Sequence, residues 1–192
     1  MTKRFQSIAS VAAFLGGIVG GSGAVLLPAV AAAKTPEVIV NAQSDLRFGT
    51  FMVFGSGSRN VSYTGNVTDV SLVALEGNPT GPARFTVSYD RGNESKHVLD
   101  IELEMVISTP PRVRDGGVEG QLSAFETDLA NTGSLAPGQP IRVELRNCRT
   151  RVCSVSFSVG ARLDVTRQFG GANLVIPIPV DVTVISAERQ GR

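Results

Sequence analysis

The stretch that decides how this chain folds is HVLDIELEMVI, His97 to Ile107. Its apolar and acidic side chains alternate strictly. The apolar set is Leu99, Ile101, Leu103, Met105 and Ile107, and the acidic set is Asp100, Glu102 and Glu104. Successive side chains of a β-strand point to opposite faces, so a period of two predicts a strand with one face on a core and the other in solvent.

The same alternation recurs along most of the chain, between short runs of Gly, Pro, Asn and Asp. Ala83–Tyr89 directs Phe85, Val87 and Tyr89 to one side. Further predicted strands are Glu37–Gln43, Asp45–Phe54, Arg59–Thr64, Val67–Leu75, Val118–Glu126, Ile141–Arg146 and Ser154–Asp164. Within 123–131 a helical turn is an open alternative. Many short strands with turn signals and almost no helical period predict an all-β fold, an antiparallel β-sandwich.

One long final strand is predicted from Leu174 to Val184. It has six inward positions, which are Leu174, Ile176, Ile178, Val180, Val182 and Val184. Pro177 and Pro179 share the opposite parity and lack the backbone N–H that a neighbouring strand would accept. We therefore expect both prolines to face an unpaired sheet edge.

The two cysteines, Cys148 and Cys153, lie at the tip of what the pattern predicts as a hairpin from Ile141 to Asp164. In an oxidising compartment we expect them to form a disulfide. Cys153 shares its parity with the apolar residues of its strand, whereas Cys148 does not. The conflict predicts one extra residue, a β-bulge, near Arg146 and Asn147.

The N-terminus reads as an export signal that ends at residue 33. Lys3 and Arg4 precede an apolar run, and the sequence AVAAA at 29–33 offers a small-residue cleavage site. The run is long enough to cross a bilayer, but its glycines and Pro28 favour cleavage over retention as an anchor. We therefore predict a signal peptide at 1–33 and one exported domain at 34–192, which stays in the periplasm, reaches the cell surface or is secreted.

The composition argues against several classes of function. The predicted cleavage removes two of the 18 basic side chains and none of the 17 acidic ones, which leaves a net charge of −1 and no footprint for nucleic acid. The chain has one His and no Trp. A ladder of acids two apart along a strand is too widely spaced for calcium, so a solvated face is favoured. Gly55–Ser58 lacks the lysine and helix of a phosphate loop and is expected to form a turn. We predict no catalytic residue, metal or cofactor, and hence no enzyme.

Four short motifs identify a family resemblance: LRFGT at 46–50, ARFTV at 83–87, VGARL at 159–163 and VDVTV at 180–184. In order and spacing they resemble the bacterial domain of unknown function 4402 family, whose members are exported. The resemblance implies an immunoglobulin-like or pilin-like sandwich with no catalytic residues to carry over. It marks Leu46 and Leu163 as motif positions, Phe48 and Phe85 as core residues, and Gly49 and Gly160 as backbone turns. Ser88-Tyr89 and the two cysteines depart from the family pattern.

Two functions stay open at this point. The first is a non-catalytic structural or interaction protein of the bacterial cell envelope, with a fimbrial or adhesin-like surface subunit as its finer form. The alternative is a free-standing periplasmic or secreted binding module that does not assemble. Either would meet a protein partner or a second copy of itself, with no nucleic acid and no membrane insertion after cleavage. Glu37–Ala42 is a candidate donor for assembly by strand exchange, whereas a complete final strand would let the domain close itself.

Overall fold

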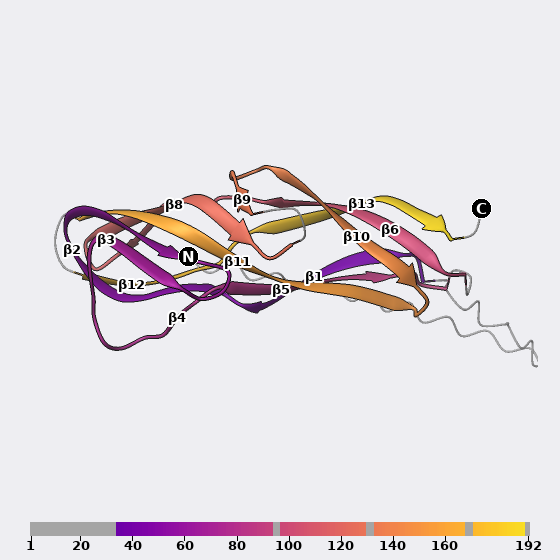
Figure 1. The fold of residues 1–192 in the computed structure, drawn as a ribbon, viewed down its shortest axis with the longest axis horizontal. Coiled ribbons are helices and arrows are strands. Elements are labelled where there is room, and N and C mark those ends of the chain that lie inside the picture. Colours follow the sequence, from indigo (N-terminus) through magenta and orange to yellow (C-terminus); the bar gives the residue numbers. More distant parts are fainter. Residues whose placement is uncertain (1–33, 94–96, 130–132, 168–170, 191–192) are drawn as a thin grey trace, which may run out of the picture. The chain divides into compact units, whose positions relative to one another are not determined.

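A computed structural model describes residues 34–93, 97–129, 133–167 and 171–190 of the chain (Figure 1). The predicted signal peptide, 1–33, lies outside the described residues. The described residues form thirteen strands and no helix, and the strands pair antiparallel in two packed sheets. The predicted all-β, antiparallel sandwich is therefore confirmed. None of the described residues forms a helix that is long and apolar enough to cross a membrane.

The larger sheet has the strand order β1 (Glu37–Ser44), β5 (Ala83–Asp90), β11 (Val152–Arg167), β2 (Leu46–Val61) and β12 (Gly171–Ile176). Two further strands lie beside β2, namely β3 (Val67–Ala74) and β4 (Thr80–Gly81). Beside β11 lies β8 (Val118–Thr127), which also pairs with β7 (Val113–Asp115) and β9 (Ser134–Leu135). The predicted strand at 118–126 thus runs on to Thr127, which excludes the helical turn for residues 123–127.

The smaller sheet contains the strand that opened the sequence argument. It has the order β10 (Pro140–Cys148), β6 (Leu99–Ile107) and β13 (Val180–Arg189). Every apolar residue of the alternating set in β6 is buried, and the acids between them are half-buried on the outer face. β10 and β13 pair with the two edges of β6, which is therefore the central strand of the smaller sheet.

Two predicted strands, Asp45–Phe54 and Arg59–Thr64, are a single strand, β2. The prediction of a turn at Gly55–Ser58 is wrong, because these residues form a wide bulge within β2. Val53 pairs with Leu72 and Ser58 with Val70, so four residues of β2 oppose Ser71 alone. The bulge bends β2, so its first half pairs with β12 and its second half with β11.

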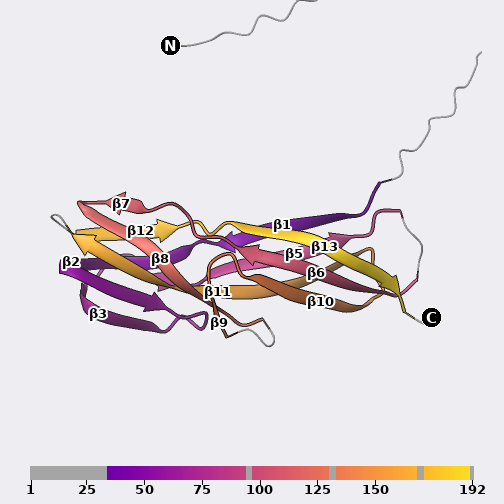
Figure 2. The same ribbon diagram turned by 90° about the horizontal axis from the view of Figure 1, so that it is seen from above.

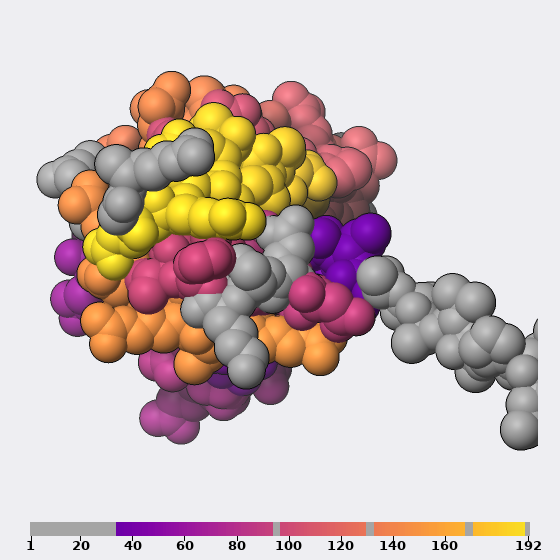
Figure 3. Space-filling model, turned by 90° about the vertical axis from the view of Figure 1, so that its right-hand side faces the viewer, coloured from indigo at the N-terminus to yellow at the C-terminus, as the bar shows by residue number. Residues whose placement is uncertain are grey.

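The prediction of a single strand from Leu174 to Val184 is also wrong. Its residues form β12 in the larger sheet and β13 in the smaller one, joined by Pro177-Ile178-Pro179 (Figure 2). Ile178 is buried in this link, while both prolines are exposed. Among the described residues, β12 pairs with β2 alone, and the carbonyl of Pro179 accepts a hydrogen bond from the Ser108 amide. Figure 3 shows β13, in yellow, on the surface.

The hairpin predicted from Ile141 to Asp164 does not form, because β10 pairs with β6 and β11 pairs with β5, in opposite sheets. The predicted bulge at Arg146 and Asn147 is confirmed: Leu145 pairs with Ile101 and Cys148 with Leu99, so two residues oppose Asp100. The bulge turns Cys148 inward, where only 2% of it is exposed. The expected disulfide joins Cys148 to Cys153, with Cα atoms 5.9 Å apart, and thereby links the two sheets.

Neither glycine of the family motifs lies in a turn, which corrects the role inferred for them. Gly49 has a φ of 65° inside β2, where the register against β12 shifts. Gly160 lies inside β11, where the partner on one side changes from β5 to β2. A Cβ atom on Gly160 would collide with the backbone of residues 61–63, so only glycine lets β2 leave across β11 at this point.

Candidate functional site

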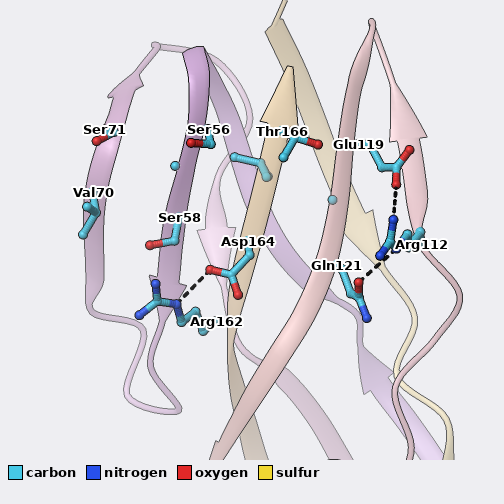
Figure 4. Close-up of a pocket in the computed structure, with 13 residues that line it drawn as sticks. Ser56, Ser58, Val70, Ser71, Arg112, Glu119, Gln121, Arg162, Asp164 and Thr166 are labelled. Carbon is cyan, nitrogen blue, oxygen red and sulfur yellow. Dashed lines mark hydrogen bonds and ion pairs between the residues drawn. The ribbon is translucent and has the colours of Figure 1, made fainter. Parts of the chain in front are cut away.

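A polar groove of about 480 Å³ lies on the outer face of the larger sheet (Figure 4). Its floor comes from β2, β11 and β8, and its two sides from β3 and from the segment that leads into β7. The inward side chains of these strands pack in the core, so the side chains between them necessarily face the groove. The groove is therefore a direct product of the strand alternation.

The register brings together hydroxyl, amide and carboxyl groups that are far apart in the sequence. Asp164 on β11 lies opposite Ser58 on one side and Gln121 on the other. One pleat further along, Thr166 lies between Ser56 and Glu119. Two parallel rows of polar side chains thus cross the groove floor.

Arginine side chains neutralise both carboxylates of the groove. Arg112 donates from Nε to Gln121 Oε1 at 3.0 Å and from Nη1 to Glu119 Oε1 at 2.8 Å, and Arg162 donates to Asp164 Oδ1 at 2.9 Å. Hydrogen bonds from Arg112 and Arg114 lower the pKa of Glu119. Burial alone would raise the pKa of Asp164, but hydrogen bonds from Ser123 and Arg162 lower it.

This chemistry suits binding rather than proton transfer. A general acid or base near neutral pH needs a pKa close to 7, whereas both groove carboxylates are held ionised. The only histidine of the chain, His97, is exposed at the start of β6, outside the groove. In the described part of the chain, no group of three or more His, Cys, Asp or Glu side chains could hold a metal ion. Hydroxyl groups and neutralised ion pairs can donate hydrogen bonds to a polar ligand and accept hydrogen bonds from it. Such a site suits a ligand that carries no net charge.

Exposed large apolar side chains are concentrated on β3 and next to it, and we call this set the β3 rim. Among the described residues, five of the eleven exposed large apolar side chains belong to it. They are Phe54, Val67, Val70, Val73 and Leu75, with exposed fractions of 71, 39, 56, 47 and 42%. Of the five, Val70 lines the groove, whereas Val67 lies opposite the inward Val61, on the other face of the sheet.

The residues singled out in the sequence lie outside this surface. Leu46, Phe48, Phe85 and Leu163 are buried in the core, and neither the two cysteines nor the two prolines line the groove. The acids of β6 face outward on the smaller sheet, where Glu102 pairs with Arg142 at 2.8 Å and Asp100 accepts the Asn147 amide at 2.8 Å. Asp100 thus stabilises the β10 bulge.

Sequence reasoning missed a buried arginine. Arg59, on β2, is 1% exposed, and its guanidinium binds both carboxylate oxygens of Asp69 at 2.6 and 2.7 Å. It also donates to the Phe48 carbonyl at 2.6 Å and lies 5.0 Å from the centre of the Phe51 ring. Arg59 therefore ties the second half of the bent strand to the first. An arginine among polar residues gave no signal of burial.

A second charged cluster, also missed, lies beside the disulfide. Asp90 accepts hydrogen bonds from Lys34 at 2.8 Å, Arg151 at 3.0 Å and the Gly92 amide at 2.8 Å. These contacts, that of Lys34 above all, hold the pKa of Asp90 far below its usual range. Arg91 is buried and donates to the carbonyls of His97 and Cys148. The sequence DRG at 90–92 indicates a turn, and this was the only feature of the sequence that pointed to the cluster.

The comparison with known proteins finds one family. The model of the family described as Domain of unknown function (DUF4402) matches residues 38–176, and the chain belongs to this family. The resemblance inferred from the four motifs is thereby confirmed. No curated protein and no solved structure matches the chain. The family match ends with β12, so β13 lies beyond it.

Proposed function

We propose that the protein is an exported, non-catalytic structural or interaction protein of the bacterial cell envelope. The observation that carries this proposal is the β3 rim. Five exposed large apolar side chains lie on this edge strand or next to it, and a concentration of exposed apolar side chains is typical of protein interaction sites. The partner is a protein or a second copy of the chain, without nucleic acid and without membrane insertion after cleavage.

Two features support export. The N-terminal 33 residues have the charge, hydropathy and small-residue pattern of a signal peptide. The disulfide between Cys148 and Cys153 is the kind of bond that persists in oxidising compartments. The periplasm, the cell surface and secretion all agree with these features.

A fimbrial or adhesin-like role is the finer form of the proposal. In the part of the chain that the structure describes, residues 152–158 of β11 pair with β5 on one side and with no strand on the other. A hollow of about 850 Å³ lies between this stretch and β10. A strand from a neighbouring subunit would find a free edge there. The candidate donor, Glu37–Ala42, is part of β1 and pairs with β5 of its own chain. Strand exchange would thus require β1 to leave that site.

The test is localisation in a bacterium that expresses the full chain. We expect intact mass analysis of the mature protein to show cleavage at or within two residues of Ala33. We also expect an impermeant label, or release of the periplasm, to place the protein outside the cytoplasm. An uncleaved, cytoplasmic protein with two reactive thiols would refute the proposal.

The alternative is a free-standing binding module, and the polar groove favours it. Its volume of about 480 Å³ falls in the range of small-molecule sites, and its paired charges suit a polar, uncharged ligand. Calorimetry with a panel of neutral sugars and amides tests this function. Binding that is lost in Asp164→Asn and kept in Asp181→Asn, an exposed residue of β13, would support it. No heat from any member of the panel would speak against it.

A further inference from the structure

We infer that a second hollow, where β1 and β5 meet β2 and β4, binds an acidic sugar through Arg47 and Arg84. We call it the arginine hollow. Its volume is about 530 Å³, and it shares no lining residue with the polar groove. The inference goes beyond the proposed function and does not depend on it.

Strand pairing brings the two arginines to this hollow from distant parts of the sequence. Because β1 pairs with β5 and the start of β2 pairs with β4, the chain from β1 into β2 runs antiparallel to the chain from β4 into β5. Ser44 lies opposite Arg84, and Arg47 lies opposite Gly81. The offset of three residues separates the two arginine positions by about 10 Å along the strands. Both arginines have buried neighbours on either side in the sequence, so their side chains point away from the core.

Arg47 and Arg84 differ from most arginines of the described residues in having no partner within the chain. Most of the others bind a carboxylate or a backbone carbonyl, as Arg59 and Arg162 do. The described arginines with neither an ion pair nor a hydrogen bond are Arg47, Arg84, Arg149 and Arg189. Arg149 lies in the turn between β10 and β11 and Arg189 ends β13, whereas Arg47 and Arg84 line the same hollow.

The charge of the arginine hollow is positive and is not balanced from within. None of the described residues that line it is an Asp or a Glu. Asp45, the nearest acid in the sequence, is exposed, does not line the hollow and forms no ion pair with either arginine. A guanidinium can donate two parallel hydrogen bonds to a carboxylate or a phosphate. Two such groups without a counter-ion therefore favour a ligand that carries one of these anions.

The other polar groups of the hollow leave the arginines as its main free donors. The Gln43 amide donates to the Thr86 hydroxyl at 2.6 Å, and the Ser44 hydroxyl donates to the Pro82 carbonyl at 3.2 Å. A Cβ atom on Gly81 would lie 3.8 Å from Arg47 Nη2, so this guanidinium extends over the floor of the hollow.

The size and lining of the hollow indicate what carries the anion. A volume of about 530 Å³ falls in the range of small-molecule sites and is far larger than a bare phosphate needs. Apart from glycine, Pro82 is the only apolar residue of the lining, which argues against an apolar ligand. An amino acid would bring an ammonium group, and the hollow has no carboxylate to receive it. A sugar with a carboxylate or a phosphate has both the polar body and the negative charge that the hollow requires.

The test is an NMR titration of the purified, isotope-labelled and disulfide-bonded protein with glucuronate, glucose 6-phosphate, glucose and inorganic phosphate. We expect both acidic sugars to shift the amide signals of residues 43–47 and 80–84. Glucose should not bind, and phosphate should bind more weakly. Affinity for glucuronate should fall as salt is added, because exposed charges are screened. A glucuronate-containing oligosaccharide separates the two sources of such a ligand: tighter binding than glucuronate indicates a polysaccharide, and equal binding indicates a free sugar.

Two variants test the assigned residues. Arg47→Gln and Arg84→Gln should each weaken glucuronate binding about tenfold, since each removes charge-assisted hydrogen bonds. Their free energies of unfolding should be unchanged, because neither side chain has a partner in the fold. The matched control is Arg149→Gln, which makes the same change of charge at another exposed arginine without a partner and should bind glucuronate normally.

Four outcomes would overturn the inference. They are no binding of either acidic sugar, binding of glucose as tight as that of glucuronate, binding of inorganic phosphate as tight as that of the sugars, and an equal loss in Arg149→Gln. None of these results bears on export or on interaction with a protein, so the proposed function stands or falls by its own test.

Discussion

The two ends of β11 differ in how they are held. From Val159 to Arg167, β8 pairs with β11 on one side and β2 covers most of the other, and the inward residues Val159, Ala161, Leu163 and Val165 are at most 2% exposed. Among the described residues, the strand from Val152 to Ser158 pairs with β5 alone; Cys153 and Val155 are only half-buried, and Phe157, next to the boundary, is 3% exposed. Core burial therefore falls where lateral pairing stops.

Covalent and ionic contacts are concentrated at the end that pairing leaves open. The disulfide joins the start of β11 to β10, and Arg151 joins it to Asp90. At the other end the corresponding contact is the buried Arg59, which holds the bent strand β2 from inside. The comparison teaches that one strand can rely on packing along half of its length and on a disulfide and an ion pair along the other half.

The strongest test of this difference between the two ends of β11 is Gly160→Ala, because Gly160 lies at the boundary between them. The added Cβ would meet the backbone of residues 61–63, which cannot move aside as a side chain can. We expect a loss of at least about 4 kcal/mol in the free energy of unfolding, measured by denaturant titration. Gly133→Ala is the control, because a Cβ there would contact nothing within 4 Å. Equal stability of the two variants would show that β2 and β11 are not in close contact here.

Next in size is Arg59→Met, which tests the fully paired end. The change leaves Asp69 and the Phe48 carbonyl without their donor in a mostly buried site, so we expect a loss of about 3 kcal/mol. Arg142→Met removes an exposed arginine from its pair with Glu102 and should cost about 0.5 kcal/mol at most. Thermal and chemical denaturation measure both. If the two variants were equally stable, Arg59 would not hold β2 together.

At the open end, replacement of both Cys148 and Cys153 by Ser should cost about 2 kcal/mol, because the loop that the bond closes is short. Hydrogen exchange should rise at the adjoining ends of β10 and β11 and stay unchanged near Gly160. Adding a reductant to the wild-type protein is the matched experiment and should give the same loss. Uniform loosening of the whole of β11 would contradict the division between its two ends.

The smallest expected effect is the acid sensitivity that Asp90 confers. Its pKa in the folded protein lies below that in the unfolded chain, so its contribution is complete above about pH 4 and is lost as the pH falls below that value. Asp90→Asn should therefore reduce the slope of stability against pH in this acidic window, in urea titrations at several pH values. Asp181→Asn, at an exposed site, is the control. If the slope were unchanged in Asp90→Asn, the ion pairs of Asp90 would not contribute to the stability of the fold.

The features that could be predicted from the sequence were those that depend on residues close together in the chain. The strand at β6 was evident because the alternation is regular, and the bulge at Arg146 and Asn147 followed from a conflict of parity within a few residues. The choice of partner strand was not local. The link Pro177-Ile178-Pro179 keeps the parity of the strands on both sides, so the apolar pattern continues unbroken while the chain changes sheets.

The groove was beyond prediction for a related reason. Its polar residues come from strands more than a hundred positions apart, as Ser58 and Asp164 illustrate, and each one reads as an ordinary solvated side chain. Only the register places them side by side. The buried Arg59 escaped notice because the bend of β2, which encloses it, depends on contacts with three other strands.

The passage from β12 to β13 also sets the order in which the fold can be completed. The first half of β2 can pair with β12 only after residues 171–176 are available. In the same way, β6 gains its second neighbouring strand only from residues 180–189. Pairings between such distant segments form slowly, because loop closure comes before any contact is gained. A chain that emerges N-terminus first therefore stays open until almost all of it is available. If the chain is exported, as proposed, this delay would leave it unfolded while it crosses a membrane.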